Sequence, residues 1–238
     1  MRISPTDIAF LKSTTPLGYL PVESGFDRLA ADPEMLFDLE PGDVLLEAGA
    51  ESPGLYVMVH GAVELVLTAG AGHEKIVEFA KTGDFLCEEG LFSGTPRPYS
   101  VRALTQATVL RLPEERVGQW IERYPEFGRH LLALINERIE YFSRDVFTQR
   151  TKNATARLVC YLLCQFNHAP RTPDGSYFLT VPLPRRKLAA RLGITSEHLS
   201  RAFRELREQG LIVSEGSGYF IPDVLRLSAY VCPAGCDW

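Results

Sequence analysis

The pattern of apolar residues changes at Pro113, and this change limits the possible folds more than any other feature. Before it, short apolar runs alternate with turn residues among which glycine is frequent. Short runs at near-regular spacing with such turns indicate the strands of an all-β barrel, sandwich or roll. Residues 1–35, ahead of them, carry only weak helical signals. The predicted strands are Val44–Leu46, Leu55–Val59, Val63–Leu67, Ile76–Phe79 and Val101–Leu112.

After Pro113 the apolar residues follow the spacing of helices. A short helix is predicted over Glu114–Arg123 and a long one over Glu126–Gln149, with Pro125 at a tolerated first-turn position. Charged residues flank the apolar stripe of the long helix, as they do on helices that pair with a second copy. We therefore predict a dimerisation helix, and the alternative is a helix that lies on the β domain. The stripe, at steps of three and four, is Leu131, Ile135, Ile139, Phe142 and Val146.

A third helix is predicted over Asn153–Phe166, because its residues are apolar on nearly all sides and therefore suit a core. A loop rich in proline and glycine follows over residues 169–176, and then a strand over Tyr177–Val181.

The strongest functional signal is the segment Leu188–Leu206, which reads LAARLGITSEHLSRAFREL. Two short helices are predicted on either side of a tight turn at Gly193, with Thr195 capping the second helix. This is the spacing of a helix-turn-helix, whose second helix enters the major groove of DNA by its N-terminal residues. Two apolar runs, Leu211–Val213 and Gly218–Ile221, then predict a hairpin wing.

Three residues of the second helix, Glu197, Ser200 and Arg201, share one face. A carboxylate can accept a hydrogen bond from cytosine N4, and arginine can form a bidentate pair with guanine. The alternative is a Glu–Arg pair within the helix, but the position in the first turns of a recognition helix favours DNA. The neighbours that we also expect to contact DNA are Thr195, Ser196, His198, Arg204 and Arg186.

The charge distribution agrees with a nucleic-acid partner, although the net charge of −5 does not. Between Pro184 and Gly210 seven basic and three acidic residues give +4, which leaves −9 for the rest of the chain. An acidic body with a basic contact surface is typical of DNA-binding proteins. A solvated amphipathic helix pair is the other interpretation of these charges.

These features together resemble the CRP/FNR family of transcription regulators, over nearly the full length of the chain. The resemblance implies an α+β protein with a cyclic-nucleotide-binding-type β-roll as sensor over residues 1–125. It also implies a long dimerisation helix over residues 126–150 and a winged helix-turn-helix DNA-binding domain over residues 151–238. The motifs in the N-terminal half are Gly42-Asp43, Gly49, Tyr56, Gly61-Ala62-Val63, Gly83-Asp84-Phe85 and Gly90-Leu91-Phe92.

Two further similarities point to particular branches of the family. The Glu197, Ser200 and Arg201 triplet is similar to the one that FNR-type members use on TTGAT-like half-sites. Lys152–Thr155, with Arg157 and Tyr161–Leu163, looks like the nitric-oxide-responsive DNR-type members. The resemblance thus implies a homodimer on palindromic double-stranded DNA, RNA polymerase as a partner, and a nitric oxide or redox signal sensed through haem.

The effector pocket departs from the cAMP-binding pattern, in which the phosphate cassette supplies Gly-Glu and later Arg-Ser. Here Cys87 replaces the glycine, Glu88 is kept, and Arg97 precedes a proline, which lacks the amide and hydroxyl donors that a phosphate would use. The Thr-Ser pair expected on the dimer helix is Phe142-Ser143. We therefore expect a pocket at these five positions that does not bind cAMP, although a cAMP-responsive regulator stays an alternative.

Metal and haem candidates are few. Residues 1–35 contain no cysteine, so the N-terminal iron–sulfur cluster of FNR is not expected. His73 and His130 are the haem ligands to test first, although each can also be interpreted as an ordinary surface histidine. Cys160 with Cys164, and Cys232 with Cys236, could hold zinc or a cluster, or could simply pack as small apolar residues.

Other classes of protein fit less well. A cupin-like metal enzyme needs clustered histidine and carboxylate ligands, and the chain has no His-x-His pair. A protein that only binds other proteins would leave the placement of Glu197 and Arg201 unexplained. With no apolar run of about 18 residues and no signal peptide, a cytoplasmic protein without membrane contact is expected, with its five cysteines reduced.

Overall fold

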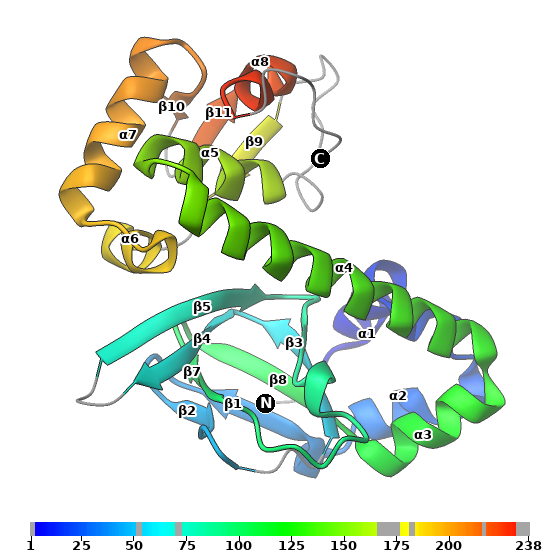
Figure 1. The fold of residues 1–238 in the computed structure, drawn as a ribbon. Coiled ribbons are helices and arrows are strands. Elements are labelled where there is room, and N and C mark those ends of the chain that lie inside the picture. The colour runs from blue at the N-terminus through cyan, green and yellow to red at the C-terminus, as the bar shows by residue number, and fades with distance from the viewer. Residues whose placement is uncertain are drawn as a thin grey trace. The chain divides into compact units, whose positions relative to one another are not determined.

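The computed structural model describes residues 3–50, 54–69, 73–165, 177–180, 184–215 and 218–231 (Figure 1). Within the chain, contacts define two compact units, Met1–Arg138 and Ile139–Trp238, and each is described by itself. The boundary between them falls inside one helix, α4, which spans Pro125–Thr151.

Short helices form the N-terminal lead-in of the first unit. The first of them, α1 (Pro5–Thr14), begins with a capping box in which the Ser4 hydroxyl and the Asp7 carboxylate each bond the other residue's backbone N–H. The others are η1 (Pro16–Tyr19), η2 (Val22–Ser24), α2 (Phe26–Ala30) and η3 (Pro33–Met35).

Eight strands then form two antiparallel four-stranded sheets, ordered β1-β8-β3-β6 and β2-β7-β4-β5. This confirms the predicted β-roll. The short helix η5 (Glu88–Gly90) follows β6. The strands are β1 (Leu36–Leu39), β2 (Val44–Leu46), β3 (Gly54–His60), β4 (Ala62–Ala69), β5 (His73–Lys81), β6 (Phe85–Leu86), β7 (Tyr99–Ala103) and β8 (Ala107–Pro113).

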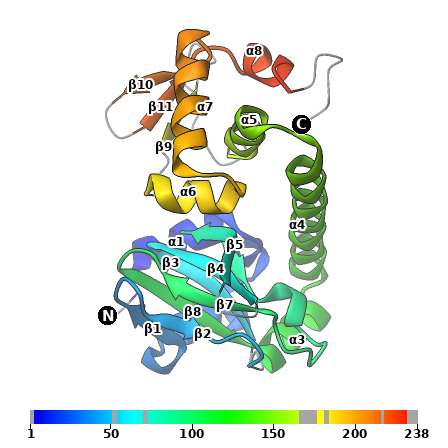
Figure 2. The same ribbon diagram turned by 60° about the vertical axis from the view of Figure 1, so that its left-hand side comes forward.

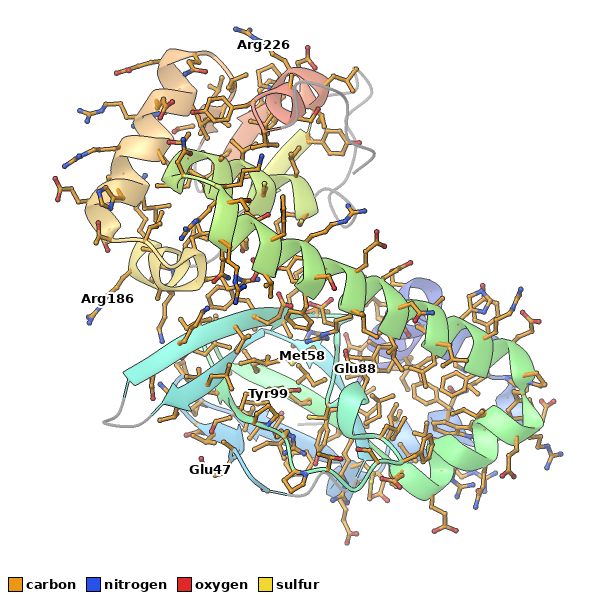
Figure 3. The ribbon with its side chains drawn as sticks, in the orientation of Figure 1. Glu47, Met58, Glu88, Tyr99, Arg186 and Arg226 are labelled. Atoms are coloured by element: carbon orange, nitrogen blue, oxygen red, sulfur yellow. The ribbon has the colours of Figure 1, made fainter. Side chains whose placement is uncertain are left out.

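Strand β3 is apolar and buried on both of its faces, because it lies between two hydrophobic cores. Leu55 and Val57 belong to the core that includes Phe26 and Trp120 from the helices. Met58 points the other way, into the core between the two sheets, where Figure 3 also shows Tyr99. The helix α3 (Glu114–Arg123) carries Trp120 into the first of these cores.

Two strand predictions need correction. The run Val101–Leu112 is not one strand, because it turns between β7 and β8, where the Leu104 amide bonds the Ala62 carbonyl. Strand β1 was not predicted, because Asp38 interrupts its apolar pattern. In the fold the Asp38 carboxylate accepts a hydrogen bond from the Thr108 hydroxyl at 2.8 Å on the neighbouring strand.

The second unit packs helices against a small sheet around one apolar core. The helices are α5 (Ala154–Cys164), α6 (Arg185–Leu192), α7 (Ser196–Glu208) and α8 (Val224–Ala229). The sheet has the order β10-β11-β9, with strands Val213–Glu215, Gly218–Ile221 and Tyr177–Thr180.

The predicted first wing strand, Leu211–Val213, is also placed differently. Gly210 has a positive φ of 67°, and the Leu211 amide bonds the Leu206 carbonyl, so the chain closes the end of α7 there. Leu211 and Ile212 are buried in the core, and the strand β10 starts only at Val213.

The turn between β3 and β4 yields a stability prediction. Gly61 has φ 79°, and a Cβ atom there would lie 2.2 Å from the Gln106 carbonyl oxygen. We expect Gly61→Ala to lower the free energy of unfolding by roughly 2–5 kcal/mol, from the strained φ and the clash together. Gly49→Ala is the control, because Gly49 has a similar φ of 82° with no atom within 4 Å. It should cost only about 1–2 kcal/mol in urea denaturation, and equal losses would contradict the clash.

Candidate DNA-reading surface and effector site

The helix-turn-helix forms as predicted, from α6 and α7 (Figure 2). Gly193 makes the turn with φ 64°, a left-handed conformation that glycine adopts without strain. The Thr195 hydroxyl caps α7 by accepting a hydrogen bond from the His198 amide at 3.2 Å. The apolar side chains that join the two helices are Leu188, Ala189, Leu192, Leu199, Phe203 and Leu206.

The opposite face of α7 carries the predicted reading residues, all exposed. Arg201 and Glu197 form an ion pair with exposed fractions of 58% and 73%, and the guanidinium lowers the pKa of the Glu197 carboxyl. The Ser200 hydroxyl donates to the Ser196 carbonyl at 2.9 Å. The other predicted DNA-contacting residues, Thr195, Ser196, His198, Arg204 and Arg186, are exposed as well, and Figure 3 shows Arg186 extending outward from α6.

Contacts behind α7 that the sequence did not predict hold it in place. The Phe203 ring stacks on Tyr219 of β11 with centroids 4.6 Å apart. On the same side, the Glu205 carboxylate accepts hydrogen bonds from the Thr155 hydroxyl at 2.7 Å and the Tyr230 hydroxyl at 2.5 Å. These two donors lower the pKa of Glu205, so the recognition helix is fixed to α5 and α8 by an ionised carboxylate.

The effector pocket predicted in the β-roll contains a buried arginine. Arg97 is only 2% exposed, and none of its guanidinium nitrogens has a hydrogen-bond partner among the described residues. Burial raises the pKa of the nearby Tyr56 hydroxyl, and the charge of Arg97 offsets part of this rise. Cys87 is buried too and has φ 68°, which is unusual for a residue other than glycine.

Glu88, the next predicted pocket residue, is already paired. Its carboxylate lies 2.6 Å from Nη1 of Arg138 on α4, and the same nitrogen donates to the Phe85 carbonyl at 2.9 Å. Arg138 was not predicted, because the residues are 50 positions apart and the long helix offers several exposed charges. Phe142 and Ser143 lie on the second unit, so their part in the pocket stays a prediction.

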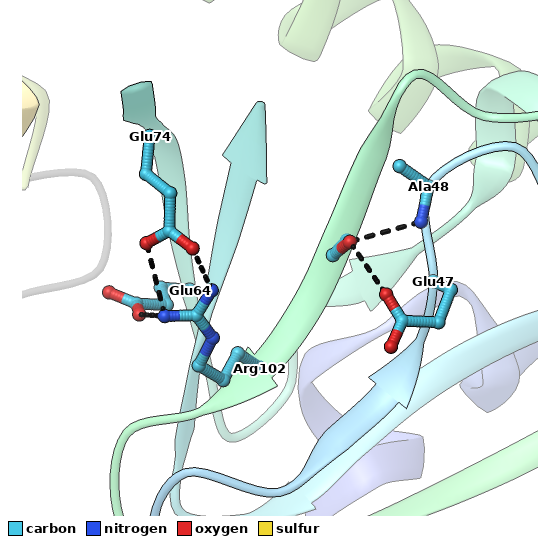
Figure 4. Close-up of polar contacts among 6 residues, drawn as sticks. Glu47, Ala48, Glu64, Glu74 and Arg102 are labelled. Carbon is cyan, nitrogen blue, oxygen red and sulfur yellow. Dashed lines mark hydrogen bonds and ion pairs between the residues drawn. The ribbon is translucent and has the colours of Figure 1, made fainter. Parts of the chain in front are cut away.

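In the sheet β2-β7-β4-β5, neighbouring side chains pair with the acidic residues (Figure 4). Arg102 of β7 lies 3.6 Å from Glu64, which is 1% exposed, and 2.5 Å from Glu74. The hydroxyl of Ser100 accepts from the Ala48 amide at 3.0 Å and donates to Glu47 at 3.3 Å. Among the described residues no group of three or more His, Cys, Asp or Glu side chains could hold a metal ion.

The predicted dimerisation stripe on α4 needs one correction. Leu131 is 2% exposed and belongs to the core of the first unit, against which Ile135 also packs. The predicted Ile139 and Val146 are exposed, at 59% and 56%, and so are Leu132 and Phe147, at 62% and 61%. The helical period predicts an apolar stripe, but the core of the first unit determines which residues at the start of α4 are buried.

The remaining candidate ligands are partly described. Nδ1 of His130 lies 2.8 Å from the Glu126 carbonyl oxygen, and the ring stacks on Tyr19 with centroids 3.6 Å apart. Burial raises the pKa of the Cys160 thiol and raises that of Cys164 to about 11, as expected for packed thiols. The His73 side chain, Cys232 and Cys236 lie outside the described residues.

No helix in the described part of the chain combines the length and the apolar character needed to cross a membrane.

Two family models match the chain, the cyclic nucleotide-binding domain over residues 36–124 and the Crp-like helix-turn-helix domain over residues 156–230. The chain is 27% identical over 175 residues to the cAMP-activated global transcriptional regulator CRP of Pasteurella multocida, which covers 72% of this chain and 82% of that one. It is 25% identical over 191 residues to the transcriptional activator protein anr of Pseudomonas aeruginosa, covering 80% and 78%.

The solved structure of FixK2 from Bradyrhizobium japonicum has a similar fold, with a TM-score of 0.69 at 21% identity, over 81% of this chain and 94% of that one. The two curated relatives are transcription regulators and not enzymes, so the cupin-like enzyme is set aside. A β-roll that matches the first model precedes a helix-turn-helix that matches the second, and the chain therefore belongs to the CRP/FNR family of transcription regulators.

Proposed function

We propose that this regulator binds a palindromic operator as a homodimer, with α7 of each copy in a major groove. The observation that carries the proposal is the exposed face formed by Glu197, Ser200 and Arg201 on a helix whose other face is fully packed. An exposed ion pair within a helix is worth only a few tenths of a kcal/mol, so Arg201 and Glu197 can exchange it for base contacts at little cost. We expect TTGAT-like half-sites, and RNA polymerase as the protein partner.

The exposed residues of α4 support the dimer. Leu132, Ile139 and Val146 are seven residues apart, which places them on one face at the spacing of a coiled-coil seam. Large apolar side chains exposed in a row are typical of an interface. Isoleucine and valine at such positions favour two-stranded pairing. Two-fold symmetry would then place the recognition helices about 34 Å apart, one turn of DNA.

For the effector, we propose a small molecule with an anionic group that pairs with Arg97. A buried guanidinium without a partner is costly, and protein sites keep such groups when a ligand supplies the counter-charge. The ion pair between Glu88 and Arg138 lies beside Cys87 and reaches α4, so a ligand here can act on that helix. Cyclic nucleotides and simpler anions share the required charge, and binding experiments distinguish them.

The nitric oxide signal and the haem expected from the family resemblance stay predictions. His130 is the haem candidate whose side chain is described. Since a carbonyl oxygen only accepts, Nδ1 must carry the hydrogen that bonds Glu126, which leaves Nε2 as the nitrogen that could bind iron. Anaerobic reconstitution with haem tests this directly: a Soret band that His130→Ala removes would support it, and no stoichiometric binding would exclude it.

The reading role of Arg201 is tested by substitution. We expect Arg201→Ala to cost about 1–3 kcal/mol of specific binding and to relax the preference at one base pair, because a bidentate base contact is lost. Arg204→Ala is the comparison, since an arginine that contacts phosphate should weaken binding equally on all sequences. Fluorescence anisotropy with single-base operator variants measures both. Equal losses on operator and random DNA for Arg201→Ala would contradict base reading.

The dimer is tested at Ile139. Because a charge in an apolar seam is left without a partner, Ile139→Asp should give monomers that lose operator binding, measured by sedimentation and anisotropy. Ala133→Asp adds the same charge at an exposed position about 100° around the helix from Leu132 and should leave the dimer intact. An Ile139→Asp protein that still sediments as a dimer would move the interface elsewhere.

Substitution by methionine should change the free energy of unfolding in opposite directions at the two arginines near the β-roll pocket. Arg97→Met removes a buried charge without a partner and should raise the free energy of unfolding of the ligand-free protein by roughly 1–3 kcal/mol. Arg138→Met leaves the Glu88 carboxylate, 2% exposed, without this partner and should lower it by roughly 3–5 kcal/mol. Urea denaturation measures both.

Ligand binding completes this test. Titration with phosphate, nitrate and cAMP should raise the melting temperature of the wild type for the anion that binds, and the shift should vanish in Arg97→Met. If Arg97→Met is destabilising, or if a bound anion stabilises it as much as the wild type, Arg97 is not the ligand's partner.

A further inference from the structure

A buried arginine fastens the helix-turn-helix to the C-terminal half of α4. Arg191 of α6 is 1% exposed, and its Nη1 lies 3.1 and 3.0 Å from the two carboxylate oxygens of Asp145. Its Nη2 donates to the Tyr141 hydroxyl at 2.7 Å, and the guanidinium lies 5.8 Å from the centre of the same ring. Both partners are on α4, one turn apart, so these contacts join α4 to the first helix of the reading motif.

A second arginine, on α5, contributes to this joint between the end of α4 and the helix-turn-helix. Arg157 donates to the carbonyl oxygens of Lys152 at 3.0 Å and Gln149 at 2.6 Å, at the end of α4. Its Nη1 lies 3.3 and 3.4 Å from the carbonyl oxygens of Leu192 and Gly193, in the turn that precedes the recognition helix. The C-terminal ends of helices carry partial negative charge, so a guanidinium between two of them stabilises their contact.

The joint is closely packed. The cavity between the end of α4, α5 and the end of α6 has a volume of about 20 Å³ and is lined by Tyr141, Asp145, Arg157, Cys160 and Leu192 among others. A space of this size holds about one water molecule. Two arginines span this junction, and little free volume is left between the last turns of α4 and the helix-turn-helix.

We propose that Arg191 is a positioning residue that sets how strictly the dimer recognises the spacing between its two half-sites. The proposal rests on the proposed function, in which the α4 helices pair in a two-fold dimer. If each recognition helix is rigidly attached to its seam helix, the distance between the two recognition helices is fixed. One additional base pair then moves a half-site by about 3.4 Å and out of reach of a rigid dimer. A loosened joint lets both helices reach a wrongly spaced operator.

The variant to use is Arg191→Met, which keeps an unbranched apolar stem and removes the charged guanidinium. The Asp145 side chain is 22% exposed, so water can solvate the carboxylate that is left behind. Removing the aspartate by Asp145→Ala would instead leave a buried arginine without its carboxylate and could unfold the unit. Tyr141→Phe, which loses only one hydroxyl, is the milder second variant. Arg129→Gln is the matched control, because it breaks an exposed pair with Glu126 on the same helix, at 70% and 60%, outside the joint.

The experiment compares full-length variants on four duplexes: the operator, the operator with one base pair added or removed between half-sites, and a single half-site. For the wild type, wrong spacing should cost the avidity of the second half-site, on the order of 100-fold in Kd. Arg191→Met should reduce this penalty about tenfold and leave half-site affinity within about twofold. Tyr141→Phe should fall between, and Arg129→Gln should match the wild type.

Two results would overturn the inference. If Arg191→Met weakens binding to all four duplexes equally, including the half-site, Arg191 merely stabilises the fold. If the spacing penalty of both Arg191→Met and Tyr141→Phe equals that of the wild type while circular dichroism shows intact helices, the joint does not set the spacing. A wild type that ignores spacing would instead refute the two-fold dimer, and this proposal with it, so the two failures are distinguishable.

Discussion

A guanidinium group removed from water needs acceptors, and this requirement links the fold of the protein to its function. Arg191 meets it with Asp145 and Tyr141, and so fastens the helix-turn-helix to α4. Arg138 meets it with Glu88, and so fastens the middle of the same helix to the β-roll. Arg97 finds no such acceptor among the described residues, which makes it the position where a ligand can contribute most. The same chemistry therefore serves attachment in two places and, in our proposal, ligand recognition in the third.

The apolar cores provide the frame for these charges. Strand β3 joins the two cores of the first unit because alternate side chains enter each of them, so the sheets and the helices of the lead-in are stabilised together. In the second unit, α5 and the inner faces of α6 and α7 form one core. The outer face of α7 takes no part in this core. Its exposed polar residues can then be selected for base contacts alone.

Helix α4 has a different role in each part of its length. Leu131 anchors its beginning in the first core, and Asp145 ties its end to the reading motif. Between these anchors lie the exposed Leu132 and Ile139, and the exposed Val146 follows directly after Asp145. Helix α4 therefore makes separate contacts in each of the two units.

The sequence by itself determined the change from strands to helices, the helix-turn-helix and the exposed polar face of its second helix. These depend on local features, namely helical periodicity, the Thr195 cap and the glycine turn, which act over a few residues. Only the tertiary structure decided which contacts bury the charges, since Arg191 and Asp145 are 46 residues apart and many acidic residues could have served. It also decided that Leu131 is internal and Leu132 exposed. A hydrophobic period shows that apolar residues share one side of a helix, but the shape of the neighbouring core decides where on that side the burial ends.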